Sequence, residues 1–99
     1  MSEHALRVFE ELDPELLNLV ENTREFTLAE GALPKKFKLL IAMALDASHG
    51  TVQSVKALAQ AAIQAGATKG EITEALRVAQ YISGVGCVYT AAHALEELF

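Results

Sequence analysis

Apolar residues recur along this chain at the three- and four-residue spacing of helices, and they nowhere alternate with polar residues long enough to indicate a strand. The first apolar group lies within residues 5–12 and follows Ser2, whose hydroxyl can cap a helix. A second helix is expected to begin at Pro14, because the Asp13 carboxylate can accept a hydrogen bond from an early amide and proline loses nothing at the first helical position. Gly31 can take the left-handed conformation that ends a helix, so we expect the second helix to run to that residue.

The third predicted helix opens at Pro34 and carries the sequence PKKFKLLIAMALDASH. One apolar stripe along it consists of Phe37, Leu40, Ile41, Ala44 and Leu45. Leu39 and Met43 extend the apolar surface to another side of the same helix. A helix that is apolar on two sides needs covering on both, and a chain of 99 residues has few elements to cover it with. The pattern therefore predicts a subunit interface on this helix.

Glycines and capping residues mark the next two helix boundaries. Gly50 breaks the chain, and Thr51 is expected to cap a fourth helix with its hydroxyl aimed at the amide near Ser54. Gly66 is expected to close that helix. The sequence TKGE, Thr68–Glu71, is a capping-box pattern that predicts the start of a fifth helix.

The end of the chain continues in the same helical pattern. The fifth helix is lined by Ile72, Leu76, Ala79 and Ile82. The segment SGVGC, residues 83–87, holds two glycines and predicts a break, a tight bend or a buried helix end. A last helix is lined by Val88, Tyr89, Ala92, Leu95 and either Leu98 or Phe99. We therefore predict an all-α fold, a bundle of about five to six helices in a single domain over residues 1–99.

The composition restricts which binding partners and which cellular compartment we expect for this chain. The chain is 52% hydrophobic with a formal net charge of −5, so it has no basic surface for nucleic acid or an anionic membrane, and we expect neither partner. Its one cysteine, Cys87, cannot form a disulfide within its own chain and fits a reducing compartment. The charged N-terminal stretch does not resemble a signal peptide, and no apolar run is long enough to cross a bilayer. We expect a soluble cytoplasmic protein.

Several familiar site patterns are missing from the sequence. It contains no phosphate-binding glycine loop of recognised spacing, no HExxH helix, no multi-cysteine metal pattern and no nucleophile elbow. We expect neither a metal nor a cofactor, and ordinary nucleotide chemistry is not indicated.

His49 is the leading candidate for chemistry. It precedes Gly50 at a helix junction, where a side chain can point into a pocket and an imidazole can titrate near neutral pH. Asp46, one turn earlier, could orient it. The alternative is a solvated or capping histidine with Asp46 as surface charge.

For each of the other candidate site residues, a purely structural role is the alternative. Thr51 and Ser54 lie at a helix start, where amides favour anions, but both are explained as a cap and a small first-turn residue. Lys38 belongs to a lysine cluster that is either solvated or reaches an acidic ligand. Cys87 is expected to be a buried small apolar residue, because free cysteine commonly packs that way. Its spacing to His93 does not place the two side chains on one helical face.

The order of these signals resembles a known family. The segment LPKKFKLLIAMALDASHG, then a helix of small residues, then QAGATKGEITEALRVAQYISG is similar to the carboxymuconolactone decarboxylase and alkyl hydroperoxidase D-like (AhpD-like) superfamily. The resemblance covers approximately residues 33–98, and AGATKGEITEAL is its most specific part. It implies an all-α fold and a homo-oligomer, commonly a trimer or hexamer.

The resemblance also shows what this chain lacks. Family members with peroxidase activity carry a CxxC pair and a following histidine, and these places fall on Thr51, Ser54 and Leu58 here. The acidic residue of the preceding helix would lie near Lys38 or Leu39, and neither is acidic. A dithiol relay is therefore not expected.

Two functions remain open on this resemblance. The decarboxylase branch implies cofactor-free proton transfer on a small organic acid, in which His49 could serve and Lys38 or Lys56 could hold a substrate carboxylate. The alternative is a non-catalytic protein that binds a small molecule or assembles on the same scaffold.

Overall fold

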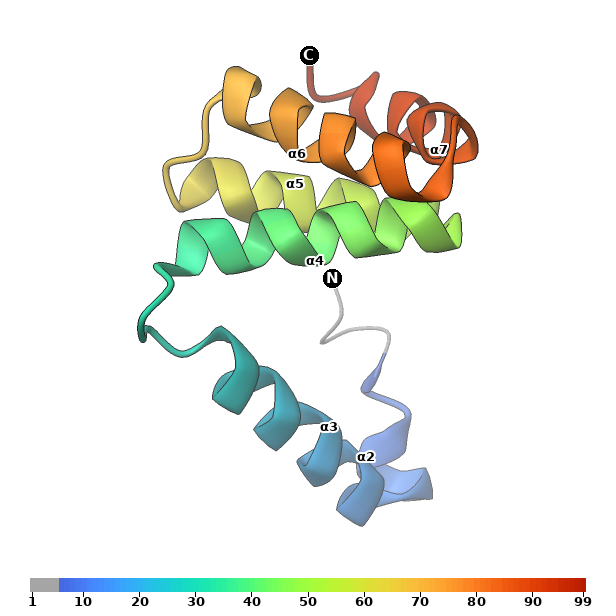
Figure 1. Cartoon of the computed structure of the whole chain (residues 1–99). Helices are drawn as coiled ribbons and strands as arrows, with labels where there is room; N and C mark the ends of the chain where they lie inside the picture. Colours follow the sequence, from blue (N-terminus) through green and yellow to red (C-terminus); the bar gives the residue numbers. More distant parts are fainter. Residues whose placement is uncertain (1–5) are drawn as a thin grey trace. The chain divides into compact units, whose positions relative to one another are not determined.

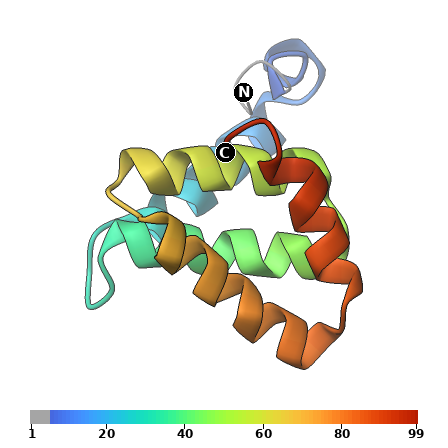
Figure 2. The same cartoon turned by 90° about the horizontal axis from the view of Figure 1, so that it is seen from above.

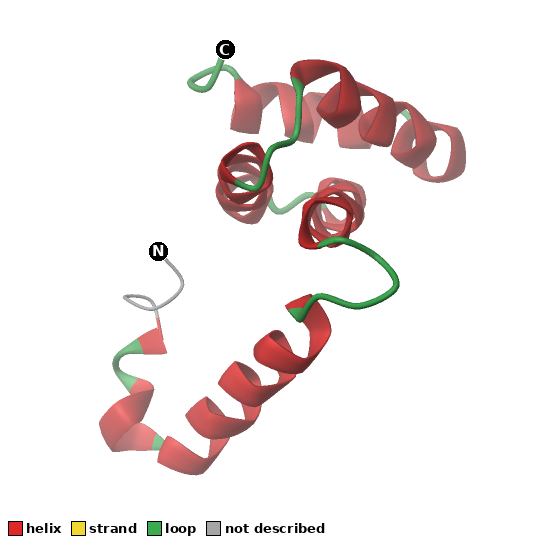
Figure 3. Ribbon diagram, turned by 90° about the vertical axis from the view of Figure 1, so that its left-hand side faces the viewer, coloured by secondary structure: helices red, strands yellow, loops and turns green. Residues whose placement is uncertain are grey.

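The computed structural model describes residues 6–99, and every regular element in them is a helix (Figure 3). In chain order the helices are α2 (Phe9–Leu12), α3 (Pro14–Leu28), α4 (Lys35–His49), α5 (Val52–Gln64), α6 (Lys69–Ser83) and α7 (Gly86–Leu95). The all-α prediction is confirmed, and the helix number agrees with the five to six expected. The predicted cap at Ser2 lies outside the described residues. None of the described helices combines the length and apolar character needed to cross a bilayer.

The chain packs as two compact units, of which the first is Met1–Glu30. In its described part the Asp13 carboxylate accepts a hydrogen bond from the Leu16 amide at 3.1 Å, and Pro14 takes the first helical position, as predicted. The prediction that Gly31 closes this helix is wrong. The backbone already leaves the helix at Ala29 through an extended conformation (φ −60°, ψ 144°), and Gly31 does not adopt a positive φ.

The second unit, Gly31–Phe99, is a bundle of four helices (Figure 1). Helix α4 packs against α5, α6 and α7, and α7 also packs against α5 and α6. Seen from above, α4 and α5 lie side by side and α7 runs across their ends (Figure 2). The buried residues of this unit are Leu39, Leu40, Met43, Ala47, Val55, Ala59, Ala62, Ala67, Ile72, Leu76, Ala79, Cys87, Ala91 and Ala94. Seven of these fourteen residues are alanine, and small side chains allow helix axes to approach closely.

Helix α4 ends in a Schellman motif, and this changes the role predicted for Thr51. Gly50 takes the left-handed conformation (φ 80°), and the Gly50 and Thr51 amides donate to the carbonyls of Ala47 and Asp46. The Thr51 hydroxyl also donates to the Asp46 carbonyl, at 3.0 Å. It forms no cap to α5, so the predicted bond toward Ser54 is wrong, because the hydroxyl completes the preceding helix instead.

The boundaries on either side of α6 follow the sequence closely. Gly66 has φ 103° and closes α5 as predicted. The capping box is confirmed: the Thr68 hydroxyl accepts from the Glu71 amide at 3.1 Å, and the Glu71 carboxylate accepts from the Thr68 amide at 2.9 Å. The break in SGVGC is also confirmed, with α6 ending at Ser83 and α7 beginning at Gly86.

The face predicted for the last helix is wrong. The buried side of α7 consists of Cys87, Ala91 and Ala94, whereas Val88 and Tyr89 are exposed. Small residues face the neighbouring helices because the close helix approach leaves no room for larger ones. Cys87 itself is buried, as expected. In α6 the predicted face holds for Ile72, Leu76 and Ala79 but not for the exposed Ile82.

Ile72 offers a test of this core, because it is fully buried whereas Val88 of α7 is 43% exposed. We predict that Ile72→Ala lowers the free energy of unfolding by about 2–5 kcal/mol, through lost burial and the cavity left behind. The control change Val88→Ala should lower it by less than about 1 kcal/mol. Urea unfolding followed by circular dichroism measures both, and equal effects would contradict the assigned core.

Candidate functional site

His49 is the last residue of α4, and its side chain is exposed at the junction with α5. Asp46, one turn earlier, is half-buried, and its carbonyl accepts both the amide and the hydroxyl of Thr51. The junction is therefore a tightly hydrogen-bonded corner with an ionisable ring at its surface.

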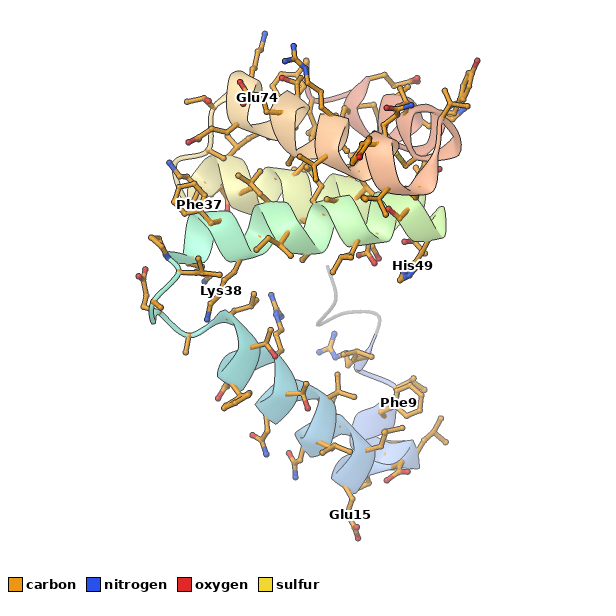
Figure 4. All side chains as sticks on the ribbon, in the orientation of Figure 1. Phe9, Glu15, Phe37, Lys38, His49 and Glu74 are labelled. Atoms are coloured by element: carbon orange, nitrogen blue, oxygen red, sulfur yellow. The ribbon has the colours of Figure 1, made fainter. Side chains whose placement is uncertain are left out.

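The remaining predicted site residues are divided between this corner and the far end of α4. Ser54 is the third residue of α5 and is half-buried. Lys38 lies eleven residues before His49, which corresponds to about 16 Å along a helix. Figure 4 shows Lys38 and His49 near opposite ends of α4, with both side chains on the same side of the helix. The structure thus brings His49, Asp46 and Thr51 together and leaves Lys38 apart.

No cysteine thiol is exposed among residues 6–99, which the structure describes. Cys87 is 3% exposed on the inner side of α7. The places that would hold the CxxC pair are occupied by Thr51 and Ser54 at the α4–α5 corner. His93 is exposed on α7. In the same residues no group of three or more His, Cys, Asp and Glu side chains is placed to hold a metal ion.

A groove of about 600 Å³ lies between α4 and α6. Its lining residues are Phe37, Leu40, Ile41, Ala44, Leu45 and Ser48 from α4, and Glu71, Glu74, Ala75, Val78, Ala79 and Ile82 from α6. The two apolar sides predicted for α4 are present, since Leu39 and Met43 are buried while Ile41 and Leu45 are 49% and 57% exposed. The α6 wall was not predicted as part of a site, although its residues 71, 74, 75, 78 and 82 recur at helical spacing.

Charged residues gather at one end of this groove, where Figure 4 labels Phe37 and Glu74. The Lys36 ammonium lies 3.0 Å from the Glu71 carboxylate and 5.0 Å from the centre of the Phe37 ring. Lys36 is therefore a bridge between α4 and α6 rather than part of a solvated lysine face. The hydrogen bond from the Thr68 amide, followed by the one from Lys36, holds the pKa of Glu71 below its usual value.

The other end of the groove is uncharged. The hydroxyl oxygens of Ser48 and Ser83 lie 2.9 Å apart and join the last turns of α4 and α6. Each hydroxyl also lies within hydrogen-bonding distance of a carbonyl one turn earlier in its own helix. The groove therefore runs from an ion-paired end to a hydroxyl-lined end beside the His49 corner.

Comparison with known proteins gives two matches. The model of the carboxymuconolactone decarboxylase family matches residues 14–97. The chain is also similar to the crystal structure of an apo carboxymuconolactone decarboxylase family protein from Legionella pneumophila, with a TM-score of 0.87 and 33% sequence identity. That match covers 94% of this chain and 83% of the other. No curated protein sequence matches the chain significantly.

The lowered pKa of Glu71 predicts a pH-dependent contribution to stability. Its carboxylate is stabilised in the folded state, so the contribution is present above the unfolded pKa of about 4.5 and is lost as the pH falls through the lower folded value. Glu71→Gln should therefore be less stable than the native chain at neutral pH, and the difference should shrink in acid. Urea unfolding between about pH 6 and pH 3 measures this difference. Glu74→Gln is the control, and a Glu71 difference that grew in acid would contradict the prediction.

Proposed function

The chain belongs to the carboxymuconolactone decarboxylase family, and from that premise we propose that it carries out cofactor-free proton transfer on a small organic acid, with His49 as the acid–base group. The observation that carries the proposal is the position of His49, exposed at the α4–α5 corner where its imidazole can meet a ligand. Imidazole changes charge near neutral pH and can therefore both donate and accept a proton.

The reaction we propose is a decarboxylation of the kind that the family name describes. The carbon–carbon bond to a substrate carboxylate breaks, carbon dioxide leaves, and the electron pair passes to the remaining carbon skeleton. The His49 imidazolium then delivers its proton to that carbon, and water restores the proton to the ring. A cation beside His49 would hold a substrate carboxylate during this step.

A second candidate function is favoured by a different observation, the apolar groove between α4 and α6. Its walls carry no nucleophile other than the Ser48 hydroxyl, and several of its aliphatic side chains are widely exposed. Such a surface suits binding or assembly without turnover. In either case we propose a homo-oligomer, since exposed apolar side chains along α4 and α6 would be covered by other subunits.

We do not propose peroxide reduction. That reaction needs an accessible thiolate and a partner thiol that resolves the oxidised sulfur. The sequence has one cysteine, and its side chain is buried in α7.

We predict that His49→Gln lowers kcat/KM for carbon dioxide release from carboxymuconolactone by roughly 100-fold or more. Because His49 is exposed, the same change should leave the unfolding midpoint nearly unaltered. The matched control is His93→Gln, which changes an exposed histidine of α7. Unaltered turnover in His49→Gln would remove His49 from the mechanism. A native chain that binds the lactone without turning it over would favour the second candidate.

A separate prediction concerns Cys87. Peroxide consumption with a dithiol reductant should be as slow for the native chain as for Cys87→Ser, because the buried thiol is not available to peroxide. The measurement follows peroxide loss under identical reductant. Rapid consumption that disappears in Cys87→Ser would contradict the assignment of acid–base chemistry.

A further inference from the structure

The groove between α4 and α6 is spanned by a polar contact at each end. Lys36 and Glu71 pair at 3.0 Å in the first turns of the two helices. The hydroxyl oxygens of Ser48 and Ser83 lie 2.9 Å apart in their last turns. Each contact joins residues 35 positions apart in the sequence, so the two helices run in the same direction and in register. The fold therefore holds the apolar walls between these contacts facing each other.

The charged end of the groove presents a carboxylate that the bundle does not pair. Glu71 and Glu74 are the ionisable residues of the lining, and both are acidic. The Glu71 carboxylate accepts hydrogen bonds from the Thr68 amide and from Lys36. The exposed Glu74 carboxylate makes neither a hydrogen bond nor an ion pair within residues 31–99. This end of the groove therefore suits a ligand group of positive charge.

The opposite end of the groove offers a hydrogen-bond acceptor. Ser48 and Ser83 have two hydroxyl hydrogens between them. Their oxygens lie 3.1 Å and 2.7 Å from carbonyl oxygens one turn earlier in their own helices, besides being close to each other. Whichever serine donates to the other, both hydrogens are used within the protein, and the Ser48 oxygen in the groove lining keeps a lone pair. A ligand group at this end is therefore expected to be a hydrogen-bond donor.

We propose that the groove binds a straight-chain aliphatic amine, with its ammonium group at Glu74 and its chain running toward Ser48. The nine residues from Glu74 to Ser83 rise about 14 Å along α6, which suits a saturated chain of about ten carbons. Four aliphatic side chains of the walls are each at least 49% exposed and would be buried against such a chain. They are Ile41 and Leu45 of α4, and Val78 and Ile82 of α6.

Other chain-like ligands fit this groove less well. A fatty acid would bring a second negative charge beside Glu74, in a protein whose net charge is already −5. A neutral alcohol would cover the Glu74 carboxylate without pairing it, which costs free energy. A polyamine would set its inner ammonium groups against aliphatic side chains that cannot solvate them. An amine with a single charged end matches both the carboxylate and the apolar walls.

This assignment names a ligand class for the second candidate function and rests on it, but it does not depend on chemistry at His49. It is compatible with a homo-oligomer, because the groove is a hollow of about 600 Å³. A subunit placed over the rims of such a hollow would enclose the bound chain.

Calorimetric titration with decylamine tests the charged end. The native chain should bind one decylamine, and Glu74→Gln should raise the Kd roughly three- to fivefold, as expected for an exposed ion pair. Glu96→Gln removes an exposed carboxylate that is not part of the groove lining and should leave the Kd unaltered. An unchanged Kd in Glu74→Gln would overturn the proposal. Equal losses in the two variants would also overturn it, since they would indicate only a general attraction to an acidic protein.

Decanoate and decanol, titrated in the same way, separate the ligand class from the groove itself. Both should bind more weakly than decylamine. If either binds and decylamine does not, the amine assignment fails while the second candidate function stands. If none of the three binds, small-molecule binding by the groove fails as well.

Methyl signals in nuclear magnetic resonance spectra locate the bound chain. Decylamine should shift the signals of Ile41, Leu45, Val78 and Ile82. The signals of Val88, which is 43% exposed on α7, should stay in place. Shifts confined to residues outside the groove would overturn the proposed site.

A decylamine that carries a hydroxyl group at the far end of its chain tests the hydroxyl-lined end. Its Kd should be roughly two- to tenfold lower than that of decylamine, because of the added hydrogen bond to Ser48. Ser48→Ala should abolish this difference and leave decylamine binding nearly unaltered. Circular dichroism confirms that each variant is folded. Equal Kd values for the two amines on the native chain would overturn the acceptor assigned to Ser48.

Discussion

Helix α4 carries apolar side chains over more of its circumference than its own four-helix unit buries. Leu39, Leu40, Met43 and Ala47 face α5, α6 and α7, and this side supplies much of the core. The stripe through Ile41 and Leu45 remains exposed and becomes one wall of the groove. Exposed aliphatic surface of this extent is unfavourable in water, which favours its burial against another apolar surface. The groove and the proposed assembly both depend on this exposed side of α4.

Much of the fold follows from local signals in the sequence. Asp13–Pro14, Gly50, Gly66 and the Thr68–Glu71 capping box each set a helix boundary through the chemistry of a few neighbouring residues, and each boundary is where it was predicted. The errors arise where tertiary packing decides. The buried face of α7 is its alanine and cysteine side because the close approach of helices excludes larger residues, which no single helix reveals. The single domain predicted over residues 1–99 stays a prediction beside the two compact units.

Only part of the candidate site could be predicted from the sequence, because contacts between helices decide the rest. Sequence alone pointed to His49 and to the absence of thiols at Thr51 and Ser54. It could not predict that the Thr51 hydroxyl binds the Asp46 carbonyl, because a threonine after a glycine can cap either the preceding or the following helix. The distance between Lys38 and His49 follows from the continuous helix α4, which places the two residues near its opposite ends. The family's scaffold is thus present with hydroxyls and an imidazole at the corner where other members carry sulfur.

The most direct test of this account is an isotope-filtered nuclear Overhauser experiment on a mixture of labelled and unlabelled chains. The account predicts intermolecular contacts to the methyl groups of Ile41 and Leu45 on α4, which are 49% and 57% exposed in the single chain. Intermolecular contacts confined to other surfaces, or none at all, would contradict the claim that the exposed side of α4 is buried against a second copy.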